Sequence, residues 1–322
     1  MLRHGSINRR LGYSAVNRSM DILWNRTARK TWEALSAPGH AMQQNWAYGE
    51  ACRALGSSVL RAEIHRAGRP VGVMQIIHRR LFGLLHAAVG TRGPVWTASL
   101  EPAEMTAALR AMAKSLPLPS LRGLFLTPDT DRADPLAEAR FRRVMTPYAT
   151  VMLDLKRPPE GLRAALHQKW RNRLAAAERT GLLIRRIDRQ PKLYSWLLEA
   201  EIAQQRRLKY RALPPALVPA WQAAGGDLRV YTAEKDGQTV GAMLFLIHGK
   251  TATYHIGWSN DQGRAASAHN LLLWTAMRKL PRLGIECLDL GGLNTDDSPG
   301  VARFKLGTGG SVKSLCGTWF RA

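Results

Sequence analysis

The pattern of hydrophobic and polar residues repeats itself once along the chain. Residues 60–77 read as an apolar strand, a charged turn at Gly68 and a second apolar strand. Residues 228–246 show the same order, with the turn at Gly237. Two apolar strands joined by a short glycine turn predict a β-hairpin, and the turn glycines are expected at positive φ.

Each predicted hairpin is followed by a further strand, a helical stretch and another strand. That last strand ends near Asp129 in the first half and near Gly292 in the second. A repeat of such long period predicts two copies of one supersecondary unit.

Helices are expected between and after the hairpins. Leu162, Leu166, Trp170 and Leu174 recur every four residues, which predicts one helix from Pro158-Pro159 to a C-cap at Gly181. Two more helices are expected at about 192–209 and 267–279.

The order of elements indicates an α/β (α+β) fold with two mixed, mostly antiparallel sheets flanked by helices. We expect a tail at residues 1–20, an N-terminal domain at 21–150 and a C-terminal domain at 151–322. For the arginine-rich N-terminus, a disordered tail, a transit peptide and a start at Met20 stay open.

Charge adds a constraint that the pattern does not give. The chain of 322 residues has 47 Lys+Arg against 24 Asp+Glu, a net charge of +23. Such an excess attracts polyanions, so nucleic acid, an anionic membrane surface and phosphorylated small molecules are candidate partners. The best apolar run, residues 241–247, is too short to span a bilayer, so we expect a cytoplasmic protein with peripheral membrane contact as an option.

Cysteine and histidine give no sign of a metal. The three cysteines, Cys52, Cys287 and Cys316, lie far apart, and the nine histidines do not cluster. We therefore expect no disulfide framework and no metal site.

Four motifs resemble those of the Fem-type aminoacyltransferases. They are residues 44–48 (QNWAY), 92–96 (RGPVW), 169–181 (KWRNRLAAAERTG), and 288–294 (LDLGGLN) followed by 300–310 (GVARFKLGTGG). The resemblance implies two tandem GNAT-like domains and the transfer of an activated acyl group to a primary amine. The chain departs from the family in having no lysine shortly after Trp46.

The resemblance further implies aminoacyl-tRNA as donor and a peptidoglycan precursor as acceptor, with no cofactor of its own. The alternative is an acyl-CoA-dependent N-acyltransferase that acts on a small-molecule, peptide or lipid amine. In either case the donor is a co-substrate.

The resemblance places the catalytic residues in the last motif. Lys305, preceded by Phe304, is expected to stabilise the oxyanion that aminolysis creates. Asp289, or Asp129 at the equivalent strand end, is the candidate general base; the alternative for both is a structural, loop-orienting role.

The resemblance also implies binding residues, some of them outside these four motifs. Acceptor binding is assigned to Arg206, Tyr210, Tyr254, Gly291, Gly292 and Asn294. Donor binding is assigned to Arg264 and Ser267, at a helix N-terminus that attracts anions, and to Lys169 and Arg171 on a basic helix. The alternatives are an ordinary helix start capped by Ser267, and a solvated or membrane-facing basic helix whose Trp170 packs inward. Asp296 and Asp297 are expected to be solvated.

Overall fold

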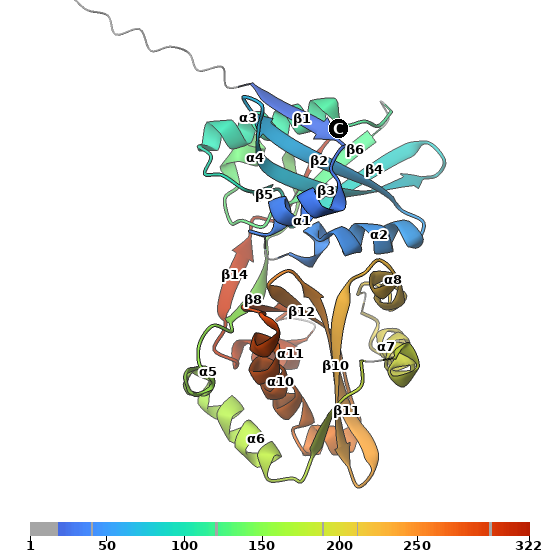
Figure 1. The fold of residues 1–322 in the computed structure, drawn as a ribbon, viewed down its shortest axis with the longest axis vertical. Coiled ribbons are helices and arrows are strands. Elements are labelled where there is room, and N and C mark those ends of the chain that lie inside the picture. The colour runs from blue at the N-terminus through green and yellow to red at the C-terminus, as the bar shows by residue number, and fades with distance from the viewer. Residues whose placement is uncertain (1–18, 40, 120–121, 189, 211, 296–297) are drawn as a thin grey trace, which may run out of the picture.

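The computed structural model describes residues 19–39, 41–119, 122–188, 190–210, 212–295 and 298–322. Two sheets lie end to end, each flanked by helices, and we call these halves the N-terminal and C-terminal bodies (Figure 1). The predicted fold class of two mixed sheets with flanking helices is confirmed. No helix in the described ranges is long and apolar enough to cross a membrane.

The N-terminal body is built on one sheet with helices on its faces. Its strands run in the order β1 (Met20–Trp24), β2 (Ser58–Arg66), β3 (Arg69–Leu81), β4 (Leu85–Thr91), β6 (Arg122–Thr127), β15 (Thr318–Arg321) and β7 (Arg142–Met145), with β5 (Val95–Trp96) paired to β3. Its helices are α1 (Arg29–Ser36), α2 (Trp46–Ala54), α3 (Pro102–Ser115) and α4 (Asp134–Glu138).

The C-terminal body repeats this plan. Its strands run in the order β14 (Ser311–Leu315), β8 (Tyr148–Asp154), β13 (Cys287–Gly292), β12 (Thr251–Ser259), β11 (Gln238–His248), β10 (Asp227–Lys235) and β9 (Leu183–Arg186). Its helices are α5 (Pro159–Ala165), α6 (Gln168–Glu178), α7 (Ser195–Leu208), α8 (Leu217–Ala223), α9 (Asp261–Ala265), α10 (Ala268–Lys279) and α11 (Pro299–Leu306).

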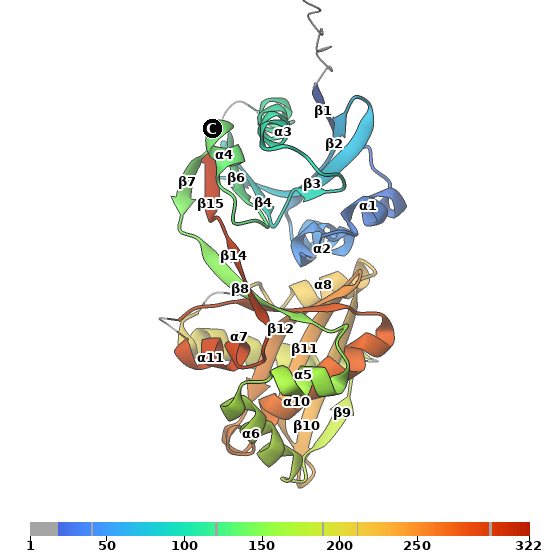
Figure 2. The same ribbon diagram turned by 90° about the vertical axis from the view of Figure 1, so that its left-hand side faces the viewer.

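Two strands carry the chain between the bodies. β8 enters the second sheet and pairs there with β14, and both run along the junction between the bodies (Figure 2). After β14 the chain returns to the first sheet, where β15 lies between β6 and β7. The end of the chain therefore belongs to the N-terminal body.

The two hairpins predicted from the repeat are present as β2–β3 and β10–β11. Gly68 and Gly237 have φ of 76° and 77°, and the residue before each is also at positive φ. This is the geometry of a two-residue hairpin turn that matches strand twist. A register shift precedes both turns, at Ile64/His65 and at Ala233/Glu234.

The helix predicted from Pro158 onward is two helices, α5 and α6. It starts at Pro159 as expected, but Leu166 and His167 adopt extended ψ values. The His167 N–H donates to the carbonyl of Gly307 at 2.9 Å, a contact from a distant segment. Leu162, Leu166, Trp170 and Leu174 nevertheless all lie in one core, as their spacing predicts.

The parallel strand pairs of the two bodies differ. β4 and β6 pair along their length, from His86–Arg122 to Thr91–Thr127. β12 and β13 pair only where Thr251–Thr253 meets Cys287–Asp289, and then they diverge. Among the residues that the structure describes, a wedge between two parallel strands thus occurs in the C-terminal body alone, and Tyr254 is the first residue of β12 beyond the paired segment.

Candidate functional site

Lys305 lies in the last turn of α11 and its side chain is turned inward. It is 8% exposed, and Nζ donates to the carbonyl oxygen of Gly292 at 2.7 Å. A side chain on Gly291, whose φ is +75°, would bring Cβ to 3.6 Å from this Nζ. Burial lowers the pKa of Lys305 to about 8, against the opposing effect of Asp289. The ammonium group is therefore withdrawn from bulk water, titrates close to neutral pH, and lies against the two glycines that the sequence singles out.

Asp289 is buried beside this lysine on β13, and its carboxylate is fully engaged. Oδ2 accepts from Arg92 Nη1 at 2.6 Å, while Oδ1 accepts from Thr150 Oγ1 at 2.6 Å and from the Gly291 N–H at 2.8 Å. A carboxylate held by three donors has a fixed orientation. These contacts favour the orienting role for Asp289 over that of a free general base.

Arg92 connects the two bodies through this carboxylate. It follows β4 in the N-terminal body, and its Nε donates to Asp129 Oδ1 at 2.7 Å, while Lys313 Nζ donates to the other oxygen of Asp129. Burial alone would lower the pKa of Arg92, but Asp289 and Asp129 outweigh it and raise the pKa. Arg92 Nη2 is buried without a hydrogen-bond partner. Sequence reasoning noticed the RGP motif but missed this role.

The candidate acceptor residues Tyr210 and Tyr254 lie close to one buried carboxylate. Tyr210 Oη donates to Glu201 Oε1 at 2.7 Å and accepts from Gln204 Nε2 at 3.0 Å. Burial raises the pKa of Tyr210 to about 12, and burial with the nearby Glu201 raises that of Tyr254. Arg206, in the last turn of α7, is exposed, and Tyr210 lies beyond the end of that helix at Leu208. Glu201 could not be recognised from the sequence, because Tyr210 and Tyr254 come close to it only when the chain folds.

The segment between β12 and α10, a candidate donor site, is largely closed on itself. Gly263 N–H donates to Asn260 Oδ1, and the N–H groups of Ala266 and Ser267 donate to carbonyls of the same segment. Ser267 has φ of 53° and caps α10 without a side-chain hydrogen bond, so the capping role expected of its hydroxyl is absent. Arg264 is exposed and bonds to the Ser259 carbonyl at 2.7 Å.

The basic helix α6 presents charge but no aromatic side chain. Lys169 is exposed, and Arg171 Nη1 donates to the Leu166 carbonyl at 3.3 Å, at the end of α5. Trp170 is buried, as in the alternative of inward packing, and its ring lies 5.8 Å from that of Phe304. Phe304 thereby fixes α11, the helix that carries Lys305, against the core.

The predicted residues thus fall into two groups around the wedge. Lys305, Asp289, Gly291 and Gly292 meet on the β13 side, and Tyr254 lies on the β12 side. Asn294 is exposed, and Asp296 and Asp297 lie outside the described residues. Within the described part of the chain, no cluster of His, Cys, Asp and Glu could hold a metal ion.

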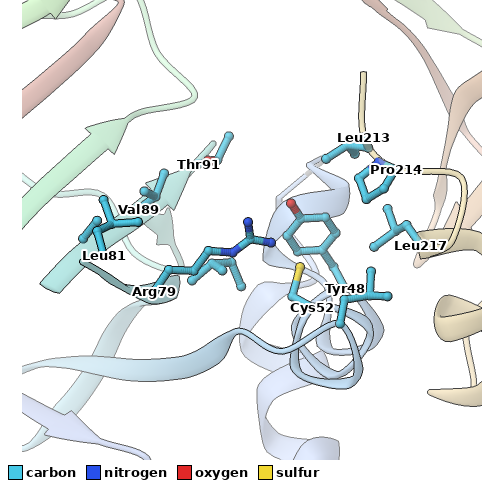
Figure 3. Close-up of a pocket in the computed structure, with 12 residues that line it drawn as sticks. Tyr48, Cys52, Arg79, Leu81, Val89, Thr91, Leu213, Pro214 and Leu217 are labelled. Carbon is cyan, nitrogen blue, oxygen red and sulfur yellow. The ribbon is translucent and has the colours of Figure 1, made fainter. Parts of the chain in front are cut away.

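A pocket of about 290 Å³ lies between the bodies. Its lining is Tyr48, Cys52 and Leu55 of α2, Ile77, Arg79 and Leu81 of β3, Ala87, Val89 and Thr91 of β4, and Leu213, Pro214 and Leu217. Figure 3 shows Arg79 extending toward the ring of Tyr48, with Leu213, Pro214 and Leu217 beyond it. Burial raises the pKa values of Tyr48 and Cys52. Thr91, the last residue of β4 in this lining, directly precedes Arg92 in the sequence.

Known proteins share the C-terminal body in sequence and the arrangement of both bodies in fold. Residues 164–306 match the family model of the acetyltransferase (GNAT) domain. No curated protein matches the chain.

Solved structures resemble the whole chain. FemX has a TM-score of 0.76 at 15% identity, covering 92% of this chain and 96% of its own. A tandem GNAT protein from the clavulanic acid biosynthesis pathway has a TM-score of 0.54 at 15% identity, covering 94% of this chain and 98% of its own. L-PGS from Bacillus licheniformis has a TM-score of 0.53 at 10% identity, covering 91% of each chain. At these identities the likenesses establish the fold. The chain thus has the fold of these solved structures over nearly its whole length, and residues 164–306 also match the acetyltransferase (GNAT) domain in sequence.

Proposed function

We propose that the protein transfers an aminoacyl group from aminoacyl-tRNA to a primary amine. The observation that carries this proposal is the Lys305 ammonium, buried beside a parallel-strand wedge and hydrogen-bonded to Gly292. An ammonium has three N–H donors, so the bond to Gly292 leaves donors for a substrate oxygen.

The reaction needs both charge stabilisation and a proton. As the amine nitrogen bonds to the ester carbonyl carbon, the carbonyl oxygen becomes an oxyanion, and Lys305 donates a hydrogen bond to it. When the tetrahedral intermediate collapses and the carbonyl re-forms, the bond to the ribose oxygen breaks and that oxygen takes a proton from Lys305. The attacking nitrogen, positively charged after bond formation, returns a proton to Lys305. A pKa of about 8 suits both transfers near neutral pH.

The choice of aminoacyl-tRNA over acyl-CoA is supported by the segment before α10. A CoA diphosphate needs free backbone N–H donors there, but those of Gly263, Ala266 and Ser267 are already engaged. Asp261, at the start of α9, pairs with Arg264 and places a negative charge at the same point. The net charge of +23 suits a polyanionic donor.

The second candidate is an acyl-CoA-dependent N-acyltransferase. The wedge favours it, because the backbone of β12 beyond Thr253 is not paired with β13 and is available to an extended chain such as pantetheine.

A donor screen separates the two candidates. The protein is incubated with a pool of aminoacyl-tRNAs or of acyl-CoAs and with primary amines, and mass spectrometry records the adduct. Lys305→Met serves as the inactive variant and Lys279→Met, an exposed lysine at the end of α10, as its control. We expect an aminoacyl adduct that RNase treatment of the donor abolishes. Transfer from acyl-CoA alone, or equal transfer by Lys305→Met, overturns the proposal.

A further inference from the structure

The tip of the β3–β4 hairpin exposes a run of large hydrophobic side chains. Phe82 is 97% exposed and Leu84 is 70% exposed, and Leu81 and Leu85 beside them are also exposed. In Figure 1 this hairpin reaches the edge of the N-terminal body, above α2 and α8. Contiguous apolar surface of this kind marks a site of interaction with a partner or a membrane.

The tip is a formed turn on paired strands. Leu81 pairs with Leu85, and the Leu84 N–H donates to the Leu81 carbonyl at 3.2 Å. Phe82 and Gly83 have φ of 49° and 73°, which closes the turn. The side chains of Phe82 and Leu84 are therefore presented by a fixed backbone, so binding through them needs little ordering of the main chain.

The charges beside the tip are all positive. Arg80 is exposed at the end of β3 and lies opposite His86, whereas Arg79 donates to Ser57 Oγ at 2.9 Å and extends into the pocket. From residue 64 to residue 100 the sequence contains no aspartate or glutamate. Apolar side chains with an arginine, Arg80, close behind them match the layers of an anionic membrane, whose acyl chains lie beneath a layer of phosphate groups.

The pocket between the bodies begins at the same hairpin. Leu81 and Arg79 line it on one side, and Leu213, Pro214 and Leu217 close the other (Figure 3). Thr91, further along its wall, is followed by Arg92 and so by the network around Asp289 and Lys305. The pocket therefore opens beside the hairpin tip, and the strand that forms its far wall ends next to Arg92.

We propose that the β3–β4 hairpin tip docks on an anionic lipid bilayer, with Phe82 and Leu84 among the acyl chains and Arg80 at the phosphates. The pocket then faces the bilayer, and the acceptor amine is carried by a membrane lipid whose apolar part enters it. The assignment of the acceptor rests on the proposed transfer activity, whereas the docking itself does not.

Vesicle binding tests the docking. The full chain is sedimented with vesicles of phosphatidylcholine and with vesicles of equimolar phosphatidylcholine and phosphatidylglycerol. The tip variant is Phe82→Ser with Leu84→Ser. Its control is Leu183→Ser with Leu283→Ser, two exposed leucines of the C-terminal body. We expect binding to the anionic vesicles, about a hundredfold weaker binding by the tip variant, and unchanged binding by the control.

The charge contribution is tested by Arg80→Gln, which should weaken binding to the anionic vesicles alone. Equal binding by the tip variant and the wild type overturns the docking. The docking is also overturned if the wild type does not bind vesicles and instead forms a dimer in analytical ultracentrifugation that the tip variant does not form.

Transfer assays separate this inference from the proposed function. The tip variant should aminoacylate a water-soluble amine at the wild-type rate and phosphatidylethanolamine in anionic vesicles at least tenfold more slowly. Equal rates on the vesicles overturn the lipid-borne acceptor. Vesicle binding without transfer from any donor refutes only the proposed function, and transfer without vesicle binding refutes only the docking.

Discussion

Replacement of Lys305 by methionine should abolish activity while making the protein more stable. Methionine has nearly the length of lysine and no charge, so it fills the same space beside Gly291. The structure lowers the pKa of Lys305 from the usual 10.5 to about 8, chiefly by burial. At about 1.4 kcal/mol per pKa unit, the charged form costs the folded state about 3 kcal/mol at neutral pH.

The expected gain is smaller than that cost. The variant loses the bond from Nζ to the Gly292 carbonyl, but Gly292 is exposed and water can replace the donor. We therefore expect the free energy of unfolding at pH 7 to rise by about 1–3 kcal/mol. Loss of an oxyanion donor should lower kcat by about a hundredfold or more.

The stability difference between Lys305→Met and the wild type should depend on pH, and the direction of that dependence tests the reasoning. Below pH 8, Lys305 is charged in both the folded and unfolded states, so burial of the ammonium lowers the stability of the wild type by its full amount. Between pH 8 and 10.5 the folded state releases the proton while the unfolded state keeps it, so the wild type gains stability as pH rises. The advantage of Lys305→Met should shrink over that window, and the transfer rate of the wild type should fall above pH 8 as the ammonium is lost.

Urea unfolding at pH 7 and pH 9.5, with Lys279→Met as control, measures this difference. The reasoning is refuted if Lys305→Met is less stable than the wild type at pH 7, or if the difference between them does not change with pH. A variant that is stable and still active would show that Lys305 lies outside the chemistry.

Three further substitutions test the structure around the site. Arg92→Met leaves the buried Asp289 carboxylate without its cation and should cost about 3–5 kcal/mol in chemical denaturation, with part of the loss regained on adding Asp289→Asn. Gly309→Ala should lower the free energy of unfolding by about 2 kcal/mol or more, since φ is +76° and the new Cβ would lie 2.2 Å from a carbonyl oxygen; a thermal midpoint equal to that of the wild type would contradict this. Trp170→Ala should cost about 3–5 kcal/mol through the cavity it creates, and tRNA affinity measured on the folded variant should not change, because the ring faces the core.

Elements governed by neighbouring residues could be predicted from the sequence. The hairpins with turns at Gly68 and Gly237 depend on local turn chemistry and strand alternation, and both are present. The stripe from Leu162 to Leu174 has the helical period and is buried. Lys305 could be singled out because a motif of contiguous residues carries it.

Contacts between distant residues could not be predicted in this way. Arg92 and Asp289 are 197 positions apart, and neither shows in the sequence that the other completes its environment. The helical pattern did not reveal the break at His167, because the carbonyl that fixes it belongs to Gly307.

The apolar run from Leu81 to Leu85 shows the same division most clearly. By composition it belongs in a core, and the sequence fixes only that it is hydrophobic, with a glycine that permits a turn. Burial depends on what packs against a segment, and that is decided when the two bodies come together. The tertiary structure leaves Phe82 and Leu84 uncovered while it buries the charged Lys305, the reverse of what each side chain's own polarity would favour.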